Sequence, residues 1–132
     1  MLALLPVQAA RVPDVANTKH NLSVSGTGNV RATTVDQVCV FCHTPHGATN
    51  FPGAPLWNRE INVNQTYTVY TSSSLDSEDI MGQLDQPGGS SKLCLSCHDG
   101  TLAIGTVNVL GGQQNVNITM TGTAVDGTMP PG

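Results

Sequence analysis

At 132 residues the chain fits one small domain, and its hydrophobic fraction of 39% is low for a core of that size. Only two Phe, two Tyr and one Trp are present, so a bulky bound group would have to supply the apolar volume that the interior lacks. With a formal net charge of −4 and five Lys and Arg in all, the chain has no basic surface for nucleic acid or anionic lipid. No stretch is apolar for long enough to span a bilayer.

The first nine residues differ from the rest. Met1 to Leu5 is apolar and leads into Val7-Gln8-Ala9, a small-residue pattern typical of the end of a secretory signal. A charged start and most of the apolar stretch are missing, so residues 1–9 are interpreted either as the remnant of a signal or as an apolar arm packed on the domain. Residues 10–132 are expected to form a single domain, because no interdomain linker is evident.

An extended arm and then a short helix are expected around the first cysteines. Residues 10–32 contain Pro13 and two glycines without a sustained period, which indicates an arm that runs over the surface. Thr34 and Gln37 have the spacing of a capping box, and side chains then recur with helical spacing until Pro45 ends the helix. The residues with this spacing are Val35, Val38, Cys39 and Cys42.

The middle of the chain predicts one strand and two further helices. Apolar and polar residues alternate from Ile61 to Tyr70, which predicts a strand. A second helix is expected from Leu75 to Leu84, where Ser74 caps the start and acidic residues suit the helix dipole. A third helix, at roughly 91–98, stops at Gly100, a residue suited to a left-handed cap.

The end of the chain changes to a period of two. Residues 106–110 and 116–120 alternate around Gly111-Gly112, which predicts a β-hairpin. The expected architecture is therefore mostly irregular chain with about three short α-helices and a small C-terminal β element within residues 106–132.

All four cysteines belong to two copies of one motif, Cys39-Val-Phe-Cys42-His43 and Cys94-Leu-Ser-Cys97-His98. The CxxCH pattern is the signature of covalent c-type haem attachment. Two thiols at this spacing can reach the two vinyl groups of one porphyrin, and the histidine that follows projects its imidazole onto the iron. We therefore expect a haem-cored domain with two covalently bound haem c groups, one on Cys39 and Cys42 with His43 as iron ligand, the other on Cys94 and Cys97 with His98.

A structural zinc site built from the two cysteine pairs is the alternative. Such a site requires no histidine after each pair and normally has a tighter loop than the stretch between Cys42 and Cys94. A disulfide scaffold would also leave both histidines unexplained. Haem attachment occurs outside the cytoplasm, which agrees with a secreted protein, either extracellular or periplasmic.

The chain has four histidines, so His20 and His46 remain as candidates for the second axial position of each iron. His46 lies three residues beyond His43 and leaves the chain on the same side as that proximal ligand, so it is expected to ligate the haem at Cys94/Cys97. His20, on the upstream arm, has the reach for the distal face of the haem at Cys39/Cys42.

Methionine is the competing distal ligand. The stretch Gly127-Thr-Met129-Pro-Pro131 is similar to the loop that supplies methionine in small monohaem cytochromes. A methionine would raise the reduction potential relative to a second histidine. Because two further imidazoles are present, Met129 ranks second as a ligand.

Four stretches resemble a known family. They are Lys19-His-Asn-Leu-Ser23, Cys39-Val-Phe-Cys-His-Thr-Pro-His-Gly-Ala48, Pro55-Leu-Trp-Asn-Arg59 and Cys94-Leu-Ser-Cys-His-Asp-Gly-Thr-Leu-Ala103. They are similar to the doubled-CxxCH multihaem c-type cytochromes, and the haem-binding part so defined spans residues 19–105. The resemblance implies a secreted electron carrier with closely stacked, six-coordinate haems, and relatives that polymerise into extracellular cytochrome filaments. Longer relatives continue with more histidines and haems, which this chain lacks after His98.

The expected function is one-electron transfer through two bis-histidine haems, between redox donors and acceptors and without enzymatic chemistry. Self-association into a filament is expected if His20 completes the haem at Cys39/Cys42 of a neighbouring chain. A monomeric periplasmic shuttle, with His20 folded back onto its own haem, is the alternative. A haem peroxidase or reductase would need an open iron position, against which the four histidines argue.

Overall fold

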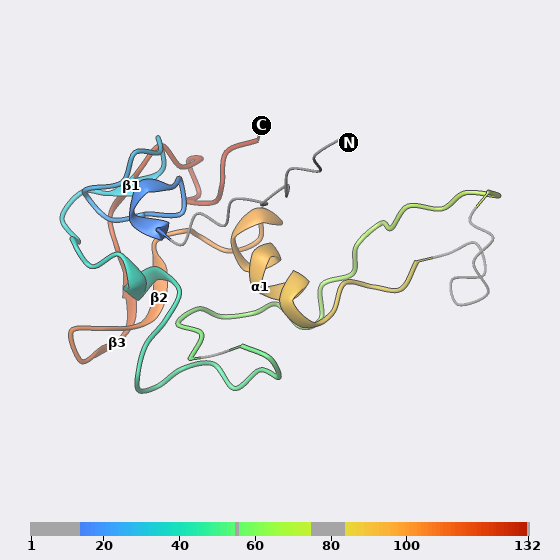
Figure 1. Cartoon of the computed structure of the whole chain (residues 1–132), viewed down its shortest axis with the longest axis horizontal. Coiled ribbons are helices and arrows are strands. Elements are labelled where there is room, and N and C mark those ends of the chain that lie inside the picture. Colours follow the sequence, from blue (N-terminus) through green and yellow to red (C-terminus); the bar gives the residue numbers. More distant parts are fainter. Residues whose placement is uncertain (1–13, 55, 75–83, 132) are drawn as a thin grey trace, which may run out of the picture.

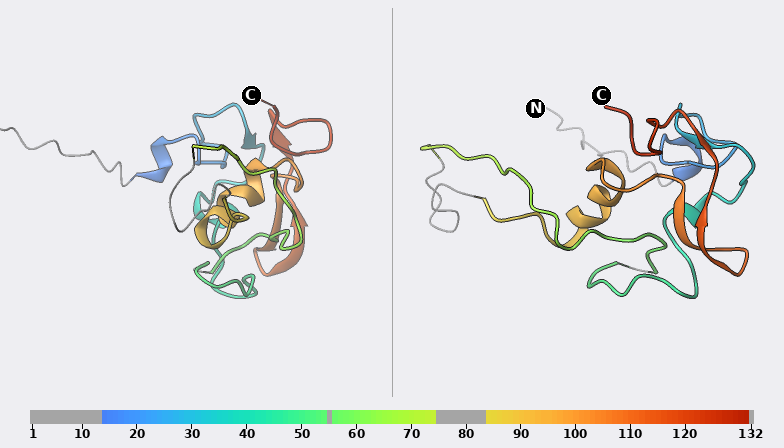
Figure 2. Two further views of the ribbon diagram at one scale, coloured as in Figure 1. Left: turned by 90° about the vertical axis from the view of Figure 1, so that its right-hand side faces the viewer. Right: turned by 180° about the vertical axis from the view of Figure 1, so that it is seen from behind.

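The computed structural model describes residues 14–54, 56–74 and 84–131. In chain order the elements are the 3-10 turn η1 (Val15–Asn17), β1 (Arg31–Ala32), the 3-10 turn η2 (Cys39–Phe41), α1 (Gly89–His98), β2 (Thr106–Leu110), β3 (Gln113–Asn117) and β4 (Met120–Thr121). The strands gather at one end of the molecule and α1 lies beside them (Figure 1). Residues 61–74 and 84–88 run out beyond α1 as an arm, which Figure 2 shows from two further sides.

Two small antiparallel sheets organise the strand-rich end. β2 and β3 form the expected hairpin, because Gly111 and Gly112, at φ 57° and 82°, adopt the positive φ values that a tight hairpin turn requires. The second strand begins at Gln113 rather than at 116, and β4 pairs instead with β1. Met120 lies opposite Ala32, so this pairing joins a strand near the C-terminus to one in the N-terminal third of the chain.

The expectation of about three helices is wrong. In the part of the chain that the structure describes there is one α-helix, α1, and the helix expected from Thr34 is reduced to η2. Tertiary pairing explains the loss: the carbonyl oxygen of Val35 accepts from the N–H of Val24 at 2.8 Å, and Thr33 donates to the carbonyl of Thr119 at 3.0 Å. These bonds hold the backbone extended where the helix was expected to start.

The strand expected from Ile61 to Tyr70 is also absent. The segment is extended, but it has a side chain rather than a strand as its partner: Tyr67 donates its N–H to the Gln86 side chain at 2.7 Å, and the Gln86 amide donates back to the Tyr67 carbonyl at 2.9 Å. The helix expected over 75–84 falls on residues 75–83, which lie outside the described residues, as does the segment 1–9.

The expected extended arm of residues 10–32 folds back on the domain in its described part. Asn21 and Ser23 are 1% and 0% exposed, and the Asn21 amide donates to the Ala16 carbonyl at 2.9 Å and to the Ser25 hydroxyl at 3.1 Å. The Leu22 carbonyl accepts from Ala32 at 2.7 Å. His20 therefore stands on an anchored loop.

The apolar core is small. It consists of Leu22, Ala32, Phe41, Ile104, Val107 and Ile118. Polar side chains are buried as well, and among the described residues these are Asn21, Ser23, Thr44, Asn58, Arg59 and Ser96. Among the residues described, no helix has the length and apolar character needed to cross a bilayer.

Candidate functional site

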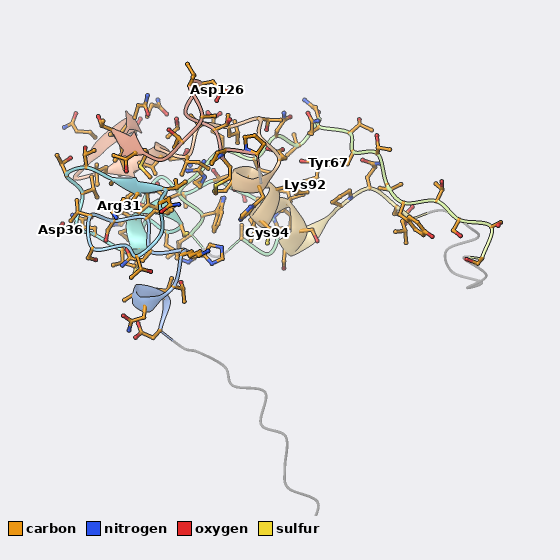
Figure 3. All side chains as sticks on the ribbon, turned by 90° about the horizontal axis from the view of Figure 1, so that it is seen from above. Arg31, Asp36, Tyr67, Lys92, Cys94 and Asp126 are labelled. Carbon is orange, nitrogen blue, oxygen red and sulfur yellow. The ribbon has the colours of Figure 1, made fainter. Side chains whose placement is uncertain are left out.

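Helix α1 carries the second CxxCH motif and turns one face toward a cavity. Side chains three and four positions apart share one face of a helix, and those on this face of α1 line the cavity. They are Ser90, Leu93, Cys94, Cys97 and His98. Figure 3 shows Cys94 and Lys92 on different sides of the helix. The helix ends at His98. The N–H of its C-cap residue, Asp99, donates to the Leu95 carbonyl at 3.1 Å, and Gly100 follows at φ 73°. Local sequence thus places both thiols and the imidazole on one surface.

The cavity is mostly apolar and has a volume of about 630 Å³. This volume lies within the usual range of small-molecule and cofactor sites, about 300–1,000 Å³. The opposite walls come from the loop around His20, from Cys42 and Trp57 near the first motif, and from Met129 near the C-terminus. The cavity therefore touches both CxxCH motifs.

His20 and His98 face each other across this site. Their ring centroids are 6.2 Å apart and their planes are at 85°. A metal–imidazole bond of about 2.0 Å on each side of one ion, with about 1 Å from each nitrogen to its ring centre, puts two axial imidazoles about 6 Å apart. The separation therefore suits two ligands of one iron. This arrangement differs from the expectation that His20 serves the haem at Cys39/Cys42.

The first motif has a different setting. In η2 the N–H of His43 donates to the Cys39 carbonyl at 2.8 Å, and the backbone of His43 forms a bridge with Trp57. The two rings are 6.0 Å apart in an edge-to-face arrangement. The indole N–H of Trp57 is buried and has no hydrogen-bond partner within the described part of the chain. Trp57 also lines the cavity, so it borders both His43 and the cavity.

The two remaining candidate ligands lie in different places. His46 is exposed and is not among the described residues that line the cavity, and the Thr44 hydroxyl donates to its carbonyl at 2.8 Å. Met129 is half-buried and does line the cavity. The structure thus brings His20 to the second motif, places Met129 on the wall of the cavity and leaves His46 beside the first motif.

The thiols follow one pattern in both motifs. Cys39 and Cys94 are exposed, Cys42 and Cys97 are half-buried, and all four are free. Burial raises the pKa of the Cys42 thiol, and the nearby Cys97 raises it further. Burial likewise raises the pKa of Cys97, while Arg59 opposes the rise at both thiols. The half-buried thiols of the two motifs are thus close enough to interact electrostatically.

Asn58 joins the first motif to the hairpin, a role that the sequence did not reveal. Its side chain is 0% exposed and donates to the carbonyls of Val40, at 2.6 Å, and Val109, at 2.8 Å. Its amide oxygen accepts from Val109 at 2.9 Å. Arg59 makes a similar connection to α1, through the Ser96 carbonyl at 3.2 Å. Only their place in the stretch Pro55 to Arg59, quoted for the family resemblance, pointed to either residue.

A mostly apolar cavity lined by thiols and two imidazoles fits a haem. Among the described residues, no three His, Cys, Asp or Glu side chains form a group that could hold a metal ion. A haem iron needs only two axial ligands from the protein, because the porphyrin supplies the other four. Comparison with known proteins adds no relative: no protein-family model matches the chain, and no curated protein matches it.

Proposed function

We propose that the protein is a dihaem c-type cytochrome that transfers electrons. The observation that supports this most directly is the apolar cavity of about 630 Å³ in which Cys94, Cys97 and two imidazoles meet, with the rings of His20 and His98 6.2 Å apart. A bound haem would supply the one-electron chemistry of its iron. The chain supplies attachment, axial ligands and an apolar surrounding that sets the potential.

In this proposal each residue has a separate role at the second motif. Cys94 and Cys97 would hold the porphyrin, and His98 and His20 would ligate its iron. Their 6.2 Å separation supports ligation within one chain, so this haem needs no histidine from a neighbour. Two axial imidazoles leave no open coordination position, which favours electron transfer over peroxidase or reductase chemistry.

At the first motif Cys39 and Cys42 hold the second porphyrin and His43 ligates its iron. His46 was expected at the haem on Cys94/Cys97. Because it is not among the described residues that line the cavity, we propose it instead as the second ligand here. The helical spacing that assigned it to the haem at Cys94/Cys97 does not apply, because the described helical turn ends at Phe41. Attachment of haem to thiols takes place outside the cytoplasm, so we place the protein in the periplasm or outside the cell, with redox donors and acceptors as partners.

Haem stoichiometry and spin state test the proposal. Pyridine haemochrome analysis should give two covalently retained haems per chain. In a chain with Cys39→Ala and Cys42→Ala, which keeps only the second haem, His20→Ala should convert that haem from low-spin to high-spin. His46→Ala in the same background is the matched control and should leave it low-spin. A chain without covalent haem would contradict the function, and the reverse result for the two histidines would contradict the ligand assignment.

A further inference from the structure

The guanidinium of Arg59 is buried between the segments that carry the two motifs. Its side chain is 1% exposed, and all four of its hydrogen bonds go to backbone carbonyl oxygens. The acceptors are those of Ser96, Ala103, Ile104 and Thr106, at 2.6–3.2 Å. Ser96 stands inside the second CxxCH motif, so one end of the guanidinium is fixed directly to that motif.

The positive charge of Arg59 is not neutralised by these bonds. Carbonyl dipoles solvate the guanidinium. Among the described residues none of its hydrogen bonds goes to a carboxylate, and its buried Nε–H has no partner there. A buried charge interacts with its surroundings through a lower effective dielectric constant than a surface charge does, and salt screens it less. Its field therefore extends into the neighbouring core.

That field reaches both motifs. Arg59 donates to the Ser96 carbonyl, between Cys94 and Cys97, at 3.2 Å, and the N–H of the adjacent Asn58 donates to the Cys42 carbonyl at 2.9 Å. Asn58, the adjacent residue, donates to the carbonyl of Val40 within the first motif. The backbone of residues 58 and 59 thus holds one cation at a fixed place relative to both attachment sites.

We propose that the buried positive charge of Arg59 raises the reduction potentials of both haems. Each potential would then lie above the value that two imidazole ligands alone would set. The inference rests on the proposed function. Ferric haem carries one more positive charge than ferrous haem, so a nearby cation disfavours the oxidised form. Arg59 touches neither iron in this scheme and acts through its field and through the position that it gives the two motifs.

Potentiometric titration of three holoprotein variants separates charge from packing. Arg59→Gln removes the charge and should lower both midpoints, by about a tenfold change in each reduction equilibrium, or 59 mV for a one-electron couple. Arg59→Lys keeps the positive charge, so both reduction potentials should stay near those of the wild type. It loses the planar set of N–H donors of the guanidinium, so the unfolding midpoint should fall. Arg31→Gln removes an exposed cation at the strand-rich end, apart from Cys94 in Figure 3, and should leave both potentials almost unchanged.

The outcomes distinguish this inference from the proposed function. Wild-type protein without two covalent haems contradicts the function itself. Two haems per chain with equal potential shifts in Arg59→Gln and Arg59→Lys, or with no shift in Arg59→Gln, contradict the role of Arg59. If Arg59→Gln does not fold, the reduction midpoints of the wild type in 1 M salt provide the test. The Debye length is then about 3 Å, so salt screens exposed charges but not a buried cation, whose effect on the potentials persists. Both midpoints falling under that condition would show that the cation responsible is exposed.

Discussion

The two CxxCH motifs share their chemistry but are carried by different local structures. The first begins with the three-residue 3-10 turn η2, and the backbone bridge between His43 and Trp57 holds its last residue. The second lies on the ten-residue helix α1, which has a complete face to present. As a result the second motif borders an apolar cavity with His20 opposite His98, whereas the ring beside His43 is that of Trp57.

The difference shows how a short motif acquires its surroundings. On α1 the helix itself aligns thiols, imidazole and two further cavity-lining side chains at helical spacing, so local structure builds one wall of the site. At η2 the turn is too short to form a face, and the setting comes from residues 56–58, whose backbone pairs with residues 42–44. The first motif should therefore depend on tertiary contacts more strongly than the second.

Removing the Asn58 side chain should test that dependence with the largest effect. Asn58→Ala leaves the carbonyls of Val40 and Val109 and the N–H of Val109 without their partner, which should lower the free energy of unfolding by about 3–5 kcal/mol. Urea denaturation measures the loss. Asn50→Ala, at an exposed position, should change the stability by less than about 0.5 kcal/mol. A loss below about 1 kcal/mol for Asn58→Ala would mean that the first motif does not rely on this contact.

A substitution in the His20 loop should affect the second site selectively. A Cβ at Gly26 would collide with the backbone carbonyl oxygen of Asn21, the residue after His20, so Gly26→Ala should cost about 1–3 kcal/mol and displace the loop. The absorption spectrum should then show partial high-spin character at one haem only. Gly88→Ala is the control, because no atom of the described residues lies within 4 Å of a Cβ there. Identical spectra for the two variants would argue against His20 as a ligand held by this loop.

The smallest effect is expected at Asp99, next to His98. Burial would raise the pKa of Asp99, but hydrogen bonds from Thr101 and Tyr67 outweigh it and lower the pKa from 3.8. The folded state therefore favours the carboxylate, so the stabilisation is present above pH 3.8 and is lost as the pH falls through the lower folded value. Because Asp99 is partly exposed, Asp99→Asn should cost less than about 1 kcal/mol at neutral pH.

Acid denaturation of wild type and Asp99→Asn measures this difference, which should vanish at the acidic end. Tyr67→Phe removes only the 2.8 Å hydrogen bond from the Tyr67 hydroxyl to the Asp99 carboxylate. It should lower the stability by less than Asp99→Asn does, with the same pH dependence. A difference between wild type and Asp99→Asn that persists in acid would mean that the carboxylate is not its source.

Elements defined by neighbouring residues could be predicted from the sequence. The helix at Cys94 and Cys97 is present, with Gly100 in the left-handed conformation, and so is the hairpin around Gly111-Gly112. Both depend on turn residues and spacings within about ten positions, which act whatever the rest of the chain does. The helix expected from Thr34 failed because its capping box competes with hydrogen bonds to Val24 and Thr119, which are distant in sequence.

The sequence by itself determined the two CxxCH motifs and the helix and hairpin near the second, since these follow from local spacing and turn chemistry. Only the tertiary structure decided that His20 lies beside His98 and that Arg59 is buried between the motifs. Polar residues such as Asn21, Ser23 and Arg59 have the composition of a surface, and nothing in their spacing shows that they will be buried. Their burial depends on carbonyl and amide partners that the folded chain brings to them.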